Sequence, residues 1–240
     1  MTSLASSETQ SPPRLKNGSE YAYEDGQCRR LGAFAKPLNV LLVIYAAVAL
    51  LLGAMSAYGM YDPGVLDEDV LSIADPEEDG ALLLFASVFF LVAMAERVIF
   101  FICVFLVCRF SYRAMKNLYT VRSGVPEMSP GASVYWYFVP IAFWFMPALG
   151  MSQIYHASIA ETGRAGRSRL VSFWWAAWIL SLVASGVANS SLTPLEAIYP
   201  ALLIAMVLSA TAALCLRLLV VRIADAQQSI LHNAAAQVFA

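Results

Sequence analysis

The sequence predicts an all-α integral membrane protein: a four-helix transmembrane bundle with one Pro-broken re-entrant or interfacial helical segment. Apolar residues make up 60% of the chain and charged residues 13%, whereas soluble proteins carry about 25% charged residues. Four long apolar runs each have about the 20 residues that a bilayer-spanning helix needs. Between the second and third runs, the uncharged stretch 132–149 is interrupted by Pro140 and Pro147, which disfavour a straight helix.

Composition and motif spacing argue against several classes of protein. No run of Lys and Arg forms the basic face that nucleic acid needs. The four cysteines contain no CxxC pair, and the two histidines, His156 and His232, lie far apart, so we expect no metal site and no cofactor. The acidic stretch D-P-E-E-D-G lacks the spaced ligands of an EF-hand loop and predicts a solvated loop.

The chain divides into three regions. Residues 1–36 are rich in Ser, Pro, Glu and Gly and have no apolar period, which predicts a disordered cytoplasmic tail. The membrane domain is predicted over residues 37–222. Residues 223–240 form a cytoplasmic C-terminal tail that can extend the last helix into water.

The first membrane helix is predicted at about 38–60. Within it, Ala49, Gly53 and Ala57 stand four residues apart, so one face is small enough for close helix packing. The loop that follows, 62–80, holds eight acidic residues and no base, and is predicted to lie outside.

The second helix is predicted at about 81–108, and Glu96 and Arg97 lie near its middle. A charge at that depth costs about 2.5–3.5 kcal/mol on insertion scales. Two interpretations stay open: a buried polar site for an ion, a proton or a partner helix, or a structural pair satisfied by its neighbours. Beyond the helix, three bases recur on one face at a spacing that suits lipid phosphates: Arg109, Arg113 and Lys116.

The segment at about 132–149 is the unusual element. Irregular backbone at membrane depth is tolerated where protein covers it, so a re-entrant or interfacial hairpin fits Pro140 and Pro147. The alternative is a kinked fifth transmembrane helix, because 18 uncharged residues can reach across a bilayer. Four aromatic residues of the segment suit the headgroup level: Tyr135, Trp136, Tyr137 and Trp144.

The last two helices are predicted at about 170–189 and 195–221. A short connection without a base makes them an antiparallel hairpin. Each carries small residues every four positions, which indicates a tight bundle. These residues are Ala177, Ser181, Ser185 and Asn189 in one helix, and Ala201, Ala205, Ser209 and Ala213 in the other.

The distribution of bases predicts the orientation. With four crossings, fourteen of the fifteen Lys and Arg residues fall on one side, and Arg97 within the membrane is the exception. The positive-inside rule makes that side cytoplasmic. Both termini are then cytoplasmic, the acidic loop is outside, and we expect a multi-pass protein of the bacterial cytoplasmic (inner) membrane.

Two stretches together resemble a known family of proteins. An aromatic-x-Tyr-Arg-Ala-x-x-Asn motif ends one helix, and Ser-Pro and then Trp-x-x-x-Pro-Ile with a second proline follow it. The matching residues are Phe110, Tyr112, Arg113, Ala114, Asn117, Ser129, Pro130, Trp136, Pro140, Ile141 and Pro147. This resembles the domain-of-unknown-function family four-three-two-eight, a group of small bacterial multi-helix membrane proteins.

The resemblance covers about residues 38–221, and its specific part lies between residues 107 and 158. Phe110 stands where the family usually has tryptophan, and Phe143 stands where asparagine often follows Pro-Ile. The second difference removes a polar group from the Pro-bracketed segment. The resemblance implies the fold and no activity, because the family name assigns none.

The sequence favours a non-catalytic polytopic membrane protein that acts through a partner protein or envelope lipids. The alternative is a small oligomeric transporter or channel that uses Glu96, Arg97 and the Pro140–Pro147 segment. An enzyme is not expected; if it were one, Glu96 and His156 would be its acid and base. Expected partners are membrane lipids, a second copy of the chain or another membrane protein, and no nucleic acid. The candidate functional or structural residues are Glu96, Arg97, Tyr112, Arg113, Asn117, Trp136, Pro140 and Pro147.

Overall fold

The structure is a computed structural model, and all of its regular elements in the described residues are helices. It describes residues 18–61, 75, 79–121, 126–160 and 169–238, without the side chains of 18–19, 195 and 231–238. The elements, in chain order, are η1 (Gly18–Tyr21), α1 (Gly32–Gly59), α3 (Gly80–Val121), α4 (Ala132–Tyr135), η3 (Ala142–Trp144), α5 (Met146–Ala160), α6 (Leu170–Ala188) and α7 (Leu195–Val238).

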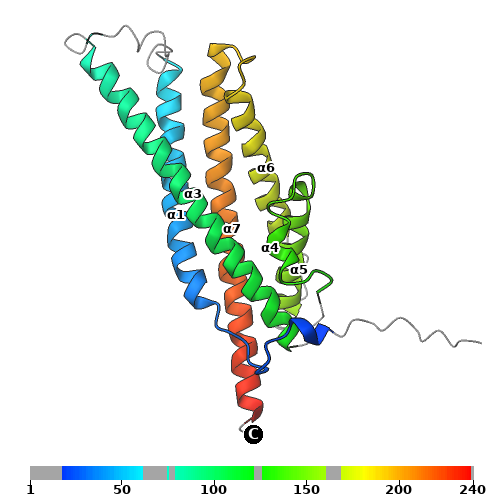
Figure 1. Cartoon of the computed structure of the whole chain (residues 1–240). Helices are drawn as coiled ribbons and strands as arrows, with labels where there is room; N and C mark the ends of the chain where they lie inside the picture. Colours follow the sequence, from blue (N-terminus) through cyan, green and yellow to red (C-terminus); the bar gives the residue numbers. More distant parts are fainter. Residues whose placement is uncertain (1–17, 62–74, 76–78, 122–125, 161–168, 239–240) are drawn as a thin grey trace, which may run out of the picture.

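Four helices of the described chain are long and apolar enough to span a bilayer: α1, α3, α6 and α7. α7 is the centre of the bundle, because it packs along both α1 and α6, while α3 packs along α1 (Figure 1). Leu219, Val220 and Ile223 of α7 are fully buried there. We call the end of the bundle that holds η1 and the C-terminal part of α7 the basal end (Figure 1).

Small residues let α1 and α7 approach closely, as the sequence predicts. Ala49 of α1 and Ala205 of α7 are both fully buried. A Cβ atom at Gly53 would already touch Leu203 and Met206 at 3.4 Å, and one at Gly59 would lie 2.7 Å from the ring of Tyr199. Gly59 is therefore the position of α1 where only the absence of a side chain allows the observed packing.

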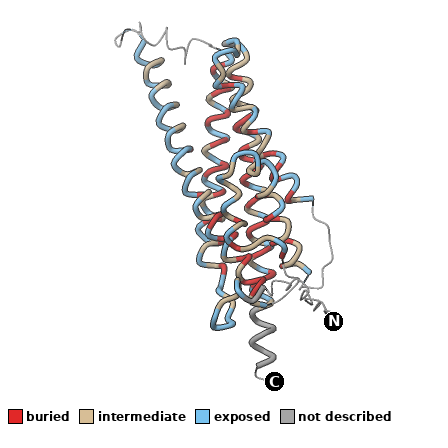
Figure 2. The backbone as a smooth tube through the Cα atoms, turned by 45° about the vertical axis from the view of Figure 1, so that its right-hand side comes forward, coloured by how far each residue is buried: buried red, intermediate tan, exposed pale blue. Residues whose placement is uncertain are grey.

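The N-terminal half of α3 diverges from the bundle, and Figure 2 shows its residues as mostly exposed or intermediate. Its exposed side chains are large and apolar, which is the composition of a face that lies in hydrocarbon. They include Leu84, Val88, Phe90, Leu91 and Val98. The C-terminal half of α3 returns to the bundle, where Phe110, Ala114 and Met115 are fully buried.

The Pro-broken segment is a hairpin beside α6 rather than a fifth crossing. α4, η3 and α5 rise from the basal end and return to it without reaching the opposite end (Figure 1). Ile141, directly after Pro140, has a φ of 68° and marks the strained tip. Pro147 is the second residue of α5, where no intrahelical donor is required, so it starts a helix instead of breaking one. The indole of Trp175 donates to the carbonyl of Trp144 (2.8 Å) and fixes the tip to α6.

The predicted tail 1–36 is wrong in its second half, because residues 18–36 are ordered against the bundle. η1 and the first turn of α1 both fall within it, and the chain between them lies on α3. Residues 1–17 lie outside the described part of the chain, and so do most residues of the predicted acidic loop. At the other end, α7 continues to Val238, so the predicted tail 223–240 begins as helix.

Candidate functional site

A buried amide network joins the N-terminal segment to three helices at the basal end. Asn117 Oδ1 accepts from the backbone N–H of Arg29 (2.9 Å), and Asn117 Nδ2 donates to the Arg29 carbonyl (2.8 Å). Asn117 Nδ2 also donates to Gln227 Oε1 (2.9 Å). Gln227 Nε2 in turn donates to the Ala114 carbonyl (3.1 Å) and to the Ser158 hydroxyl (3.0 Å). Asn117, Gln227 and Ser158 are buried, so these amides use their hydrogen-bonding capacity on each other and fix α3, α5 and α7 together.

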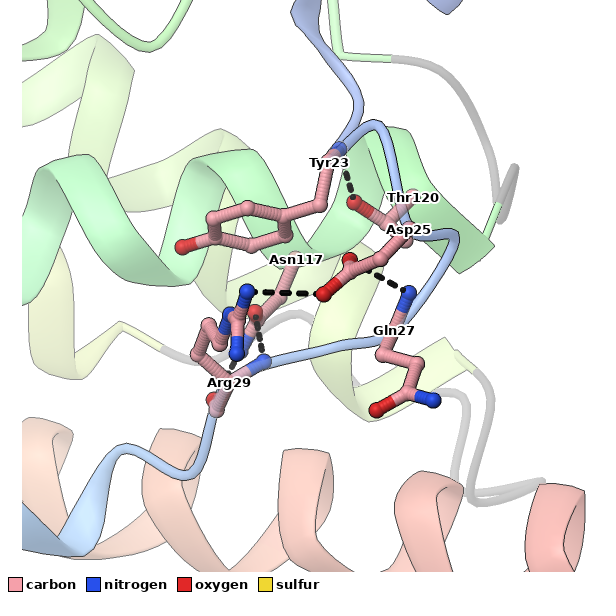
Figure 3. Close-up of polar contacts among 6 residues, drawn as sticks. All are labelled: Tyr23, Asp25, Gln27, Arg29, Asn117 and Thr120. Carbon is pink, nitrogen blue, oxygen red and sulfur yellow. Dashed lines mark hydrogen bonds and ion pairs between the residues drawn. The ribbon is translucent and has the colours of Figure 1, made fainter.

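Residues 22–31, which we call the strap, lie across the C-terminal part of α3 (Figure 3). The backbone N–H of Tyr23 donates to Thr120 Oγ1 (3.1 Å), and the Cys28 thiol donates to the Asn117 carbonyl (3.5 Å). Within the strap, the Arg29 guanidinium pairs with Asp25 at 2.7 Å. The strap is thus held mainly through backbone groups, which hydropathy does not reveal.

The three bases that follow the apolar part of α3 lie beside aromatic rings of the N-terminal region. We call Arg109, Arg113 and Lys116 the basic face. The guanidinium carbons of Arg109 and Arg113 lie 5.5 and 5.2 Å from the ring centroid of Phe34. Lys116 Nζ lies 4.6 Å from the ring centroid of Tyr23. Each such contact is worth about 0.5–1 kcal/mol at an exposed site, so the rings orient the cations without neutralising them.

No carboxylate neutralises the basic face among the described residues. Their two ion pairs are Arg29 with Asp25 and Arg97 with Glu96, and neither involves the basic face. Burial raises the pKa of the Tyr23 hydroxyl, and the nearby Arg113 guanidinium opposes that rise. Burial likewise raises the pKa of the Cys28 thiol, and the Asp25 carboxylate adds to it. Of the strap, Tyr23 is the side chain that contacts the basic face, and it does so with a neutral ring and hydroxyl.

Glu96 is buried inside the bundle although α3 is the least buried span. Its Oε2 lies 3.2 Å from Nε of Arg97, whose side chain is 54% exposed. The Tyr45 hydroxyl of α1 lies near the Glu96 carboxylate and the Ser209 hydroxyl of α7. These neighbours favour the interpretation of Glu96 as a structural residue. The Arg97 side chain, in contrast, is not enclosed by the bundle.

The other predicted residues fall into separate places. Tyr112 is exposed on α3, next to the basic face. Trp136 lines a depression between α3 and α5 together with Tyr21 and Tyr119. Pro140 and Pro147 shape the hairpin, as described above. His156 contacts the Ser152 carbonyl (3.4 Å) and the ring of Tyr155, so it shares no partner with Glu96.

A small apolar cavity lies next to Tyr45, between described residues of the bundle. Its volume is about 70 Å³, and its walls include Phe100, Tyr137, Trp178 and Ser209. Pro140 and Pro147 do not line it. A transport path through a single copy would need a continuous polar passage between Glu96 and the hairpin, and this cavity does not provide one.

Sequence reasoning identified Arg113 and Asn117 but missed their partners. Gln227 and Ser158 of the network, and Tyr23, Phe34 and Thr120 around the strap, were not predicted. A signal was present for Gln227, since Val220, Ile223 and Gln227 follow a three- and four-residue spacing that continues the buried face of α7. The role of Arg29 had no such signal, because Asn117 holds its backbone.

Comparison with known proteins gives a family match over the part of the chain that holds the amide network. A family model described as Domain of unknown function (DUF4328) matches residues 77–228. The matched part begins just before α3 and ends one residue after Gln227, so it contains all the side chains of the amide network. No curated protein and no solved structure matches the chain.

Proposed function

This chain belongs to the Domain of unknown function (DUF4328) family, and we propose that it is a non-catalytic multi-pass membrane protein whose basal end binds anionic lipid headgroups. The basic face carries this proposal. Arg109, Arg113 and Lys116 stand where α3 changes from apolar to polar residues, aromatic rings orient them, and neither described ion pair includes them. Cations beside the membrane attract anionic lipid by about 1 kcal/mol each.

A cytoplasmic position of the basal end in a bacterial inner membrane is part of the proposal. It is supported by the charge distribution, because the described Lys and Arg residues apart from Arg97 belong to the strap and to the basal parts of α1, α3, α6 and α7, whereas the α1–α3 connection carries eight acids and no base in its sequence. The non-catalytic part of the proposal rests on the amide network, whose side-chain amides are engaged in hydrogen bonds with each other, with the Ser158 hydroxyl and with backbone groups.

The proposal is tested by lipid selectivity. The purified protein is equilibrated with equal amounts of phosphatidylglycerol and phosphatidylcholine, and the retained lipids are counted by native mass spectrometry. The wild type should retain phosphatidylglycerol preferentially. Replacing Arg109, Arg113 and Lys116 by Gln should remove up to about 3 kcal/mol of the attraction to phosphatidylglycerol, which is about 100-fold in its affinity relative to phosphatidylcholine.

The matched control keeps the charge at the same positions. Replacing Arg109 and Arg113 by Lys should preserve the preference, and high salt should weaken it, because the screening length falls to about 3 Å at 1 M. A triple Gln variant that is folded and as selective as the wild type would refute the assignment.

A second candidate role, docking of a partner membrane helix, is favoured by Arg97. Arg97 lies twelve residues from Arg109 on α3, which is about 18 Å along a helix. Its half-exposed guanidinium shares an otherwise apolar face with Val98 and Phe101. A cation facing lipid at such depth costs about 2.5–3.5 kcal/mol, and a carboxylate on a neighbouring helix would offset that cost.

Photo-crosslinking in native membranes tests this docking role. A photoreactive residue at Phe101 should form a specific adduct with one membrane protein or with a second copy. The same residue at Leu180, which is exposed on α6, should give lipid adducts only. Arg97→Leu should remove the specific adduct; lipid adducts alone at Phe101 would contradict the docking role.

A further inference from the structure

The hairpin and α6 enclose a groove of about 910 Å³ that is separate from the basic face. The Trp175–Trp144 hydrogen bond joins the hairpin tip to α6 along the groove. At the basal end the two helices present Arg169 and His156. The groove therefore has an apolar deep part and a polar, basic mouth.

The walls of the groove match one leaflet of a bilayer in chemistry and length. Phe145, Leu149 and Ile179 line its deeper part, and Ser172 and Arg169 line the mouth. Arg169 and Ile179 are ten residues apart in sequence, which is about 15 Å along a helix. Half of the hydrocarbon core of a bilayer is also about 15 Å thick.

The charge at the mouth identifies the occupant. Arg169 is exposed, and neither described ion pair involves it. His156 also lines the groove, and its Nδ1 lies 3.4 Å from the Ser152 carbonyl of its own helix. The mouth also lies at the N-terminal end of α6, whose dipole adds positive potential beside Arg169.

We propose that the groove between α5 and α6 binds one anionic glycerophospholipid, with its phosphate at Arg169 and His156 and an acyl chain along Phe145, Leu149 and Ile179. An acyl chain suits the deep walls, which are apolar, and a phosphate suits the basic mouth. A zwitterionic lipid such as phosphatidylcholine also has a phosphate, but the cation of its headgroup lies close to that phosphate and weakens its attraction to Arg169. The site is formed by elements other than the basic face, so it goes beyond the function proposed above and does not depend on it.

Photoreactive lipids test the site in the full-length protein. A phosphatidylglycerol with a diazirine in its acyl chain is reconstituted with the protein, in parallel with a phosphatidylcholine that carries the same chain. Adducts are mapped by mass spectrometry. Phosphatidylglycerol should label Phe145, Leu149 or Ile179 about fivefold more than phosphatidylcholine does, as one favourable charge predicts.

Two variants test separately the charge at the mouth of the groove and the space for an acyl chain inside it. Arg169→Gln should reduce phosphatidylglycerol labelling to the phosphatidylcholine level. Ile179→Trp should narrow the deep part of the groove and reduce the adducts of both lipids there. Since the larger side chain can also disturb folding, its helix content and thermal unfolding are compared with the wild type.

The basic face serves as the independent control. Neutralising Arg109, Arg113 and Lys116 should leave groove labelling unchanged, so a failure of the groove is distinguished from a failure of the basic face. Equal labelling by the two lipids in the wild type, or labelling that Arg169→Gln does not change, overturns the proposal. Absence of groove adducts in native membranes, with adducts elsewhere on the chain, overturns it in favour of a protein that covers the groove.

Discussion

Replacing Asn117 by Ala should release the strap from α3. The side chain makes two hydrogen bonds to the backbone of Arg29, at 2.9 and 2.8 Å. At about 1 kcal/mol each, their loss lowers the free energy of strap detachment by about 2 kcal/mol, or about 30-fold in the detachment equilibrium. The third bond is internal to the bundle, and its loss leaves Gln227 Oε1 buried without that donor, which costs about 1–3 kcal/mol of global stability.

Trypsin digestion in detergent measures the strap separately from the bundle. The carbonyl that Asn117 binds is that of Arg29, and it belongs to a peptide bond that trypsin cleaves. When opening and closing are fast, the cleavage rate follows the population of the open form. Cleavage after Arg29 should therefore accelerate about 30-fold, while titration with SDS reports the global loss.

Asn189→Ala is the matched control for this experiment. Asn189 is exposed and its amide donates only to the Ser185 carbonyl of its own helix (2.7 Å). Its replacement should change neither the cleavage after Arg29 nor the SDS midpoint appreciably. If Asn117→Ala and Asn189→Ala gave equal cleavage rates after Arg29, the network would not be what holds the strap.

Three further predictions concern packing, thiol chemistry and the charged pair. Gly59→Ala should destabilise the protein by about 1–3 kcal/mol through overpacking, because the new Cβ would lie 2.7 Å from the ring of Tyr199. Gly186→Ala is the control and should not destabilise the protein, because a Cβ there meets nothing within 4 Å. Unfolding in SDS compares the two variants. Cys28 should react slowly with iodoacetamide near pH 8 and faster as pH rises, because burial and then Asp25 raise the pKa of its thiol and lower the thiolate fraction. Asp25→Asn should accelerate the reaction, and equal rates for the variant and the wild type would contradict the contribution of Asp25 to that pKa. Glu96→Gln should lower the free energy of unfolding by less than the about 3–5 kcal/mol that breaking a fully buried pair costs, since the Arg97 side chain is 54% exposed. Adding Arg97→Leu should recover part of the loss, and no recovery would argue against the pair.

The transmembrane architecture follows from sequence because hydropathy is a local property. Each of the four spans carries its own apolar run, and Pro140 marks the hairpin tip, where Ile141 takes a positive φ. The prediction was less accurate for Pro147, because a proline that breaks a helix and one that starts a helix look alike in sequence. Here the helix begins at Met146, so Pro147 needs no donor.

The basal end depends on contacts between distant residues, which a single sequence does not show. Asn117 and Arg29 are 88 positions apart, and Asn117 and Gln227 are 110 apart. The strap has too few apolar residues to predict packing, yet backbone groups of Tyr23 and Arg29 hold it on α3 through hydrogen bonds to Thr120 and Asn117. A single sequence also does not show which side chains of a helix face the bundle. Glu96 and Arg97 are neighbours in sequence, but Glu96 is buried and Arg97 faces outward.

Both lipid proposals require that the chain on each side of the hairpin faces the cytoplasm. Single cysteines at Glu127, Arg169 and Leu192, in a chain without its four native cysteines, test this with a membrane-impermeant thiol reagent on intact cells. The account predicts that only Leu192→Cys, between α6 and α7, is labelled. Labelling of Arg169→Cys from outside would mean that the hairpin crosses the membrane, and would contradict the fold and both proposed lipid sites together.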